Sequence, residues 1–106
     1  MVAVSATPTA PRMPVLFLGH GNPMNALADN AFTRALRSLG ESIPRPTAVL
    51  CVSAHWMTEG FALTSDAYPD TIHDFTGFPP ELHAVRYEPP GDPALAADAR
   101  DLLAPA

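Results

Sequence analysis

The sequence predicts an α/β fold, on the evidence of two short apolar runs and an amphipathic helix between them. Residues 15–18 (VLFL) and 48–52 (AVLCV) are continuous apolar runs of strand length. A run that is apolar at every position is typical of a strand buried on both faces of a sheet. Strand, helix and strand in this order form a βαβ unit, whose strands are expected to be parallel with a right-handed crossover.

The helix between the two runs is predicted from its periodicity and its end signals. Asp29 or Asn30 can cap its amino terminus, and the helix should run to about Leu39, with Gly40 as the stop. Its apolar stripe consists of Phe32, Leu36 and Leu39. Before it, residues 19–25 collect Gly, Asn and Pro, which predicts a turn directly after the first run.

The remaining segments are predicted from composition. Residues 61–64 form a possible third, shorter strand, and residues 65–92 form a long loop rich in Pro, Gly and aromatic side chains, which is more often functional than decorative. Asp92 as N-cap and Pro93 at the first helical position predict a last helix. Residues 1–13 are predicted to be a mobile tail.

Composition excludes several classes of function. The net charge is -5 and all six basic residues are Arg, without a basic run that could follow a phosphate backbone, so we expect no nucleic-acid partner and no membrane partner. The absence of Lys removes Schiff-base and P-loop chemistry. The single Cys51 excludes an internal disulfide and, with no secretory signal in the first residues, suggests the cytoplasm; its apolar run predicts a buried thiol.

Two histidines follow the two apolar runs. His20 stands between two glycines after the first run, and His55 follows the second run by three residues. Both would leave the carboxyl ends of parallel strands, the sheet edge at which α/β proteins bind ligands. Alone, His20 is as well explained as a surface histidine in a turn, and His55 as a core-edge histidine bonded to a backbone carbonyl. Together they suggest a metal site that needs a third ligand from elsewhere.

The long loop contains further candidates. His73 and Asp74 are adjacent, and Asp74 can orient a histidine, bind a substrate amine, or only hold a loop turn. Phe75 and Trp56 are candidates for an aromatic substrate pocket, although core packing explains each of them individually. His83 follows two prolines on a possible short helix, where a solvated surface position is expected.

Three motifs resemble a known family in order and spacing. They are residues 17–24 (FLGHGNPM), 52–56 (VSAHW) and 71–79 (TIHDFTGFP). They are similar to the amino-terminal half of the 4,5-DOPA extradiol dioxygenase family, within the LigB-type class III extradiol ring-cleavage dioxygenases. The resemblance extends from Met13 to Pro105. Asn22 is a mild departure, because the family more often has Ser there.

The resemblance implies a three-layer αβα fold around a mixed, largely parallel sheet, of which residues 14–106 would be the amino-terminal part. It implies one divalent metal held by His20 and His55, Fe(II) for activity or Zn(II) as bound, with the remaining ligands outside this chain. It implies a catechol such as DOPA and O2 as substrates, with both oxygen atoms incorporated. His73, with no established ligand role, is assigned to the surroundings of the metal or to the substrate pocket.

Two other functions fit the sequence. A zinc-dependent hydrolase on a related scaffold would use a metal-bound water, but no Glu is clearly placed as its general base. The predicted sheet layer leaves much of one face uncovered, which predicts that the chain is a fragment of a longer protein. This truncation also supports a third possibility, a non-catalytic remnant. The sequence says nothing about the oligomeric state.

Overall fold

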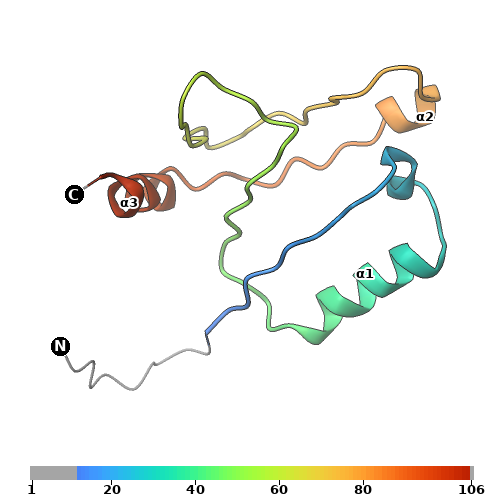
Figure 1. Ribbon diagram of the computed structural model, residues 1–106, viewed down its shortest axis with the longest axis horizontal. Coiled ribbons are helices and arrows are strands. Elements are labelled where there is room, and N and C mark those ends of the chain that lie inside the picture. Colours follow the sequence, from blue (N-terminus) through green and yellow to red (C-terminus); the bar gives the residue numbers. More distant parts are fainter. Residues whose placement is uncertain (1–11, 106) are drawn as a thin grey trace. The chain divides into compact units, whose positions relative to one another are not determined.

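The computed structural model describes residues 12–105 and divides the chain into two units, Met1–Thr47 and Ala48–Ala106. Within residues 12–105, four helical elements follow one another in the order 3-10, α, α, α (Figure 1). They are η1 (Pro23–Ala26) and α1 (Ala31–Ser42) in the first unit, and α2 (Pro80–His83) and α3 (Pro93–Leu103) in the second.

The predicted sheet is wrong for this chain. Over residues 12–105 the structure contains helices and coil but no strand, so neither the βαβ unit nor the three-layer αβα arrangement is formed. The runs 15–18 and 48–52 and the shorter segment 61–64 are all coil. Apart from the half-buried Leu63, their side chains are open to solvent, with Val15 99% and Val52 96% exposed.

The physical reason is that apolarity alone does not make a strand. A strand needs a neighbouring strand to pair its N–H and C=O groups, and a parallel sheet needs cover on both faces. The two main runs belong to different units, and two strands by themselves are marginal in water. The same lack of cover leaves Cys51 exposed rather than buried, contrary to the sequence prediction.

Helix α1 confirms the predicted amphipathic helix and its cap. The Asn30 side chain accepts a hydrogen bond from the Thr33 N–H at 3.0 Å, and the Thr33 hydroxyl accepts one from the Asn30 N–H at 3.0 Å. This reciprocal capping box satisfies two backbone donors at the helix start. Arg34 pairs with Asp29 just before the cap, at 2.9 Å.

The end of α1 corrects the prediction that Gly40 stops the helix. The helix continues to Ser42, whose hydroxyl donates to the Leu39 carbonyl at 2.8 Å. Gly40 is not among the glycines with positive φ, so it does not form the left-handed cap that ends many helices. The helix ends shortly before Pro44, because a residue that precedes proline disfavours the helical conformation.

In the second unit, residues 66–75 and 85–91 run side by side in opposite directions. The Gly91 N–H donates to the Ala67 carbonyl at 2.9 Å. The Thr71 hydroxyl donates to the Tyr87 carbonyl at 3.1 Å and accepts from its N–H at 3.3 Å. The pairs keep one antiparallel register, held by one backbone bond at Gly91 and by the side chain of Thr71. We call these two segments the loop ribbon.

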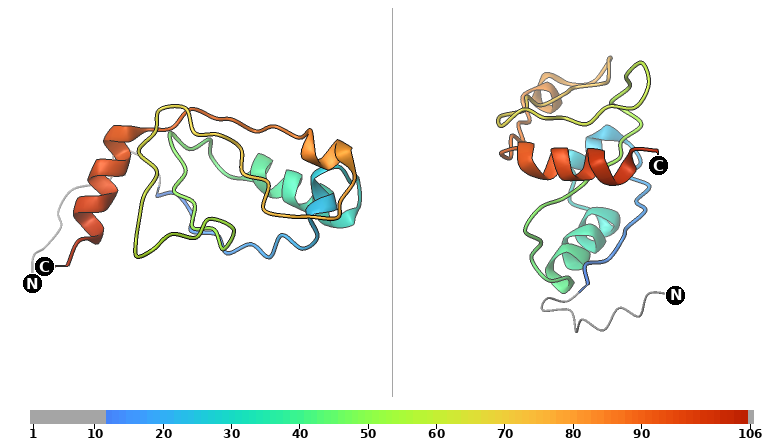
Figure 2. Two further views of the ribbon diagram at one scale, coloured as in Figure 1. Left: turned by 90° about the horizontal axis from the view of Figure 1, so that it is seen from above. Right: turned by 90° about the vertical axis from the view of Figure 1, so that its left-hand side faces the viewer.

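Helices α2 and α3 lie at opposite ends of the second unit, joined by residues 84–92 (Figures 1 and 2). The predicted last helix is confirmed as α3, whose cap Asp92 accepts from the Leu95 N–H at 2.9 Å. In α2, Leu82 is 2% exposed and is the one buried side chain among residues 12–105.

The predicted tail, residues 1–13, lies outside the described residues for its first eleven positions. Along residues 12–105, no helix has both the length and the apolar character that crossing a membrane requires.

Candidate functional site

His20 is held in a tight turn before η1. Gly21, which follows it, has φ +66°, the left-handed region that glycine adopts without strain. The His20 ring contacts the Gly21 carbonyl through Nδ1, at 3.2 Å. A carbonyl oxygen only accepts, so Nδ1 carries the hydrogen in this contact. In the neutral ring the lone pair then lies on Nε2.

Two asparagines that follow His20 in the sequence stabilise this turn through side-chain hydrogen bonds. The Asn22 side chain accepts from the Met24 N–H at 2.8 Å and caps η1. The Asn25 side chain donates to the His20 carbonyl at 3.0 Å. Within the first unit, an open hollow of about 410 Å³ borders the turn. Its polar lining includes His20, Asn22, Asn25 and Thr33.

His55 lies in a bend of the second unit and pairs with Asp74. Its Nδ1 is 2.9 Å from the Asp74 Oδ2, across nineteen positions of sequence. An ionised carboxylate only accepts, so Nδ1 again carries the hydrogen and the neutral ring has its lone pair on Nε2. Both side chains are open to solvent, 47% and 60% exposed. The His55 backbone is fixed separately, because its N–H donates to the Ser53 hydroxyl at 3.2 Å.

The predicted metal ligands therefore occupy different units, His20 in the first and His55 in the second. The sheet edge on which their convergence was predicted is not formed, so their pairing stays a prediction that rests on the motifs. Within residues 12–105, no group of three or more His, Cys, Asp and Glu side chains gathers in a way that could hold a metal ion.

His73 and Phe75 belong to an aromatic cluster beside α2. The Phe75 ring centroid is 5.4 Å from that of Phe78 and 4.8 Å from that of His83, and the His73 ring lies 5.8 Å from Phe75. The His73 Nε2 donates to the Val85 carbonyl at 2.9 Å. His83 is exposed, as predicted, and yet packs on Phe75.

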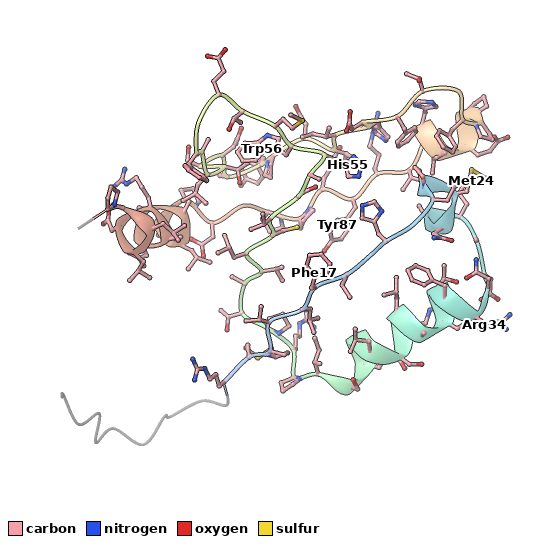
Figure 3. All side chains as sticks on the ribbon, in the orientation of Figure 1. Phe17, Met24, Arg34, His55, Trp56 and Tyr87 are labelled. Atoms are coloured by element: carbon pink, nitrogen blue, oxygen red, sulfur yellow. The ribbon has the colours of Figure 1, made fainter. Side chains whose placement is uncertain are left out.

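Trp56 follows His55 in the same bend (Figure 3). Its N–H donates to the Ser53 carbonyl at 3.4 Å, and its side chain is 37% exposed. The roles of Trp56, Phe75 and Asp74 in a substrate pocket stay predictions, since the contacts of Phe75 are to the aromatic cluster and that of Asp74 is to His55.

Sequence reasoning did not single out Asn25 or Val85. Asn25 shows only as one of several polar residues in a Gly-, Asn- and Pro-rich turn. Val85 acts through its backbone carbonyl, for which the side-chain sequence gives no signal. Orienting a histidine was one of three roles considered for the Asp74 carboxylate, but the sequence did not indicate His55 as that histidine.

Comparison with known proteins gives close relatives. The chain is 55% identical over 94 residues to 4,5-DOPA dioxygenase extradiol of Escherichia coli (strain K12), covering 89% of this chain and 35% of that protein. It is 42% identical over 91 residues to 4,5-DOPA dioxygenase extradiol of Beta vulgaris, covering 83% and 34%. It is 37% identical over 97 residues to the dioxygenase tasH of Hapsidospora irregularis, covering 81% and 30%.

The chain thus spans about a third of the length of these curated relatives. No protein-family model and no solved structure matches it. The three histidine motifs predicted this relationship, and the comparisons confirm it. Over most of its length, this chain is homologous to the 4,5-DOPA extradiol dioxygenases.

Proposed function

We propose that this chain forms part of an extradiol dioxygenase that opens the ring of a catechol such as DOPA. The observation that carries the proposal is the 55% identity to the Escherichia coli protein of that name, over 89% of the chain. Relatives from two other organisms, at 42% and 37% identity, are also named as dioxygenases. The ring would open beside its two hydroxyl groups, with both atoms of O2 entering the product.

We assign one divalent metal to this function, with His20 and His55 as two of its ligands. The donor chemistry fits, because imidazole nitrogens suit both iron and zinc. The tautomers fit as well. Each ring has Nδ1 against an oxygen acceptor, Gly21 O for His20 and Asp74 Oδ2 for His55, which leaves Nε2 as the ligating nitrogen of each neutral ring. The remaining ligands would come from residues outside this chain.

When bound, Fe(II) supplies open coordination positions at which a catechol and O2 can react with each other. The chain's own residues have simpler tasks. His20 and His55 bind the ion and keep their ring hydrogens on Nδ1. The open hollow beside His20 leaves a path for a small aromatic molecule. A reducing compartment such as the cytoplasm would suit a ferrous ion and an exposed Cys51.

The test is metal-dependent oxygen uptake by the intact protein. Metal-free protein is loaded with Fe(II) or with Zn(II), given DOPA, and followed with an oxygen electrode. Uptake is expected with Fe(II) only, with mass spectrometry showing both atoms of ¹⁸O2 in the product. If no oxygen were taken up with Fe(II), the proposal would be refuted.

Variants separate the ligands from the other histidines. His20→Ala and His55→Ala should each abolish oxygen uptake and lower the bound metal per chain, measured by elemental analysis. His83→Gln is the matched control, because His83 is also exposed but packs on Phe75. Full metal content in His20→Ala or His55→Ala would contradict the ligand assignment.

A further inference from the structure

We propose that Asp74 is a positioning residue, which fixes the ring and tautomer of His55 for metal binding instead of contacting substrate. This inference rests on the proposed function, since it gives Asp74 a role at the metal site. Its starting point is the contact of 2.9 Å between His55 Nδ1 and Asp74 Oδ2. Metal-ligating histidines commonly donate their other ring hydrogen to a carboxylate, and losing that partner commonly weakens metal binding.

The loop ribbon explains why Asp74 is directed away from its own neighbours. In an extended segment, side chains alternate between the two sides. Thr71 and His73 are two positions apart, and both bond to the facing segment, at Tyr87 and at Val85. Asp74 is the next position, so its carboxylate lies on the other side. There it meets His55 rather than the adjacent His73.

Both neighbours of Asp74 are anchored. His73 is held by the Val85 carbonyl, and Phe75 packs edge-on against Phe78 with ring centroids 5.4 Å apart. The backbone between two anchored side chains has little freedom, so the Asp74 side chain extends from a backbone position that is held in place. His73 therefore has a structural role that its sequence position did not reveal. Its bond to the Val85 carbonyl holds the segment that carries Asp74 in place.

On the other side of the contact, the backbone of His55 is held separately from its ring. Ser53 already holds the bend, since its hydroxyl accepts from the His55 N–H at 3.2 Å and its carbonyl accepts from the Trp56 N–H at 3.4 Å. The Asp74 contact acts on the ring itself, through Nδ1. Because both side chains are largely exposed, the pair contributes little to folding. Instead, the contact between Asp74 and His55 affects the direction in which the His55 Nε2 atom points.

The experiment measures metal affinity in the intact protein by competition with a zinc or iron chelator. Asp74→Asn is compared with Asp70→Asn, which makes the same charge change four positions earlier in the same loop, also at an exposed position. We expect Asp74→Asn to bind metal about 10- to 100-fold more weakly than wild type, and Asp70→Asn to match wild type. Asp74→Glu, which keeps the carboxylate, should restore part of the affinity.

A second measurement does not depend on any variant folding. Long-range ¹H–¹⁵N NMR of the metal-free wild-type protein should show His55 with its hydrogen on Nδ1. In addition, the Co(II) absorption of folded Asp74→Asn protein should differ from that of wild type. A neutral His55 with its hydrogen on Nε2 would overturn the inference. Equal affinity in wild type and Asp74→Asn would overturn it while leaving the proposed function intact. No metal binding by wild type would overturn both.

Discussion

The side-chain amide of Asn25 donates a hydrogen bond to the backbone carbonyl of His20, at 3.0 Å. The same amide, through its oxygen, accepts from the Asn30 side chain at 3.4 Å, and Asn30 caps α1. The start of the helix is thereby joined to the turn that carries His20. His20 is held by an element that begins eleven positions later, rather than by the apolar run before it.

Replacing Asn25 with Ala should loosen this turn. The variant loses the donor to the His20 carbonyl, and we expect the free energy of unfolding of the intact protein to fall by about 1 kcal/mol. Urea titration followed by circular dichroism checks the value, with Ser38→Ala on the exposed side of α1 as the control. Metal affinity should fall with it. An Asn25→Ala protein with unchanged stability and unchanged metal affinity would show that the contact does not hold His20.

Replacing Gly21 with Ala should strain the same turn more directly. The φ of +66° costs a residue with a side chain about 1–2 kcal/mol, and the added Cβ would lie 3.2 Å from the Asn25 Nδ2. The control is Gly19→Ala, one residue before His20, where a Cβ meets nothing within 4 Å and φ is not positive. Thermal unfolding should show a lower Tm for Gly21→Ala than for Gly19→Ala. Equal Tm values would contradict the described turn.

Replacing Gly91 with Ala should disrupt the loop ribbon. A Cβ at Gly91 would collide with the backbone carbonyl of Asp66, which cannot move aside as a flexible side chain can. We expect a loss of about 1–3 kcal/mol in the free energy of unfolding, typical of overpacking.

Gly40→Ala is the matched control, for which the change in the free energy of unfolding should have the opposite sign. Gly40 lies inside α1, and its added Cβ meets nothing within 4 Å. Ala is a better helix former than Gly, so this change should stabilise by about 0.5–1 kcal/mol. If denaturant titrations of the two variants shifted in the same direction, the close approach at Gly91 would be refuted.

Replacing Leu82 with Ala should be the most destabilising of the leucine truncations. Leu82 is 2% exposed, and removing a buried leucine side chain costs about 2–5 kcal/mol. The same truncation at Leu102, which is 86% exposed, should cost less than about 0.5 kcal/mol. Urea midpoints of the two variants provide the comparison. Similar midpoints would mean that Leu82 does not anchor α2.

The sequence predicted the helices well because their signals are local. Asp29 or Asn30 was predicted to cap the first helix and Asp92 the last, and in the structure Asn30 and Asp92 accept the expected backbone hydrogen bonds. The prediction at Gly40 was wrong because its identity alone does not fix the sign of φ. The strands were wrong because an apolar run such as residues 15–18 shows that a segment favours burial, but not which segment will pair with it.

For the candidate site, the sequence by itself supplied the candidate residues. It supplied His20 and His55 in recognisable motifs, placed Asp74 in a third motif, and identified the family. It did not determine which histidine Asp74 serves. Only the tertiary structure decided that, because alternating side-chain directions and the bonds of His73 and Thr71 to residues 85–91 direct the carboxylate to His55, nineteen positions away. Such contacts depend on pairing between distant segments, and no local pattern of residues encodes them.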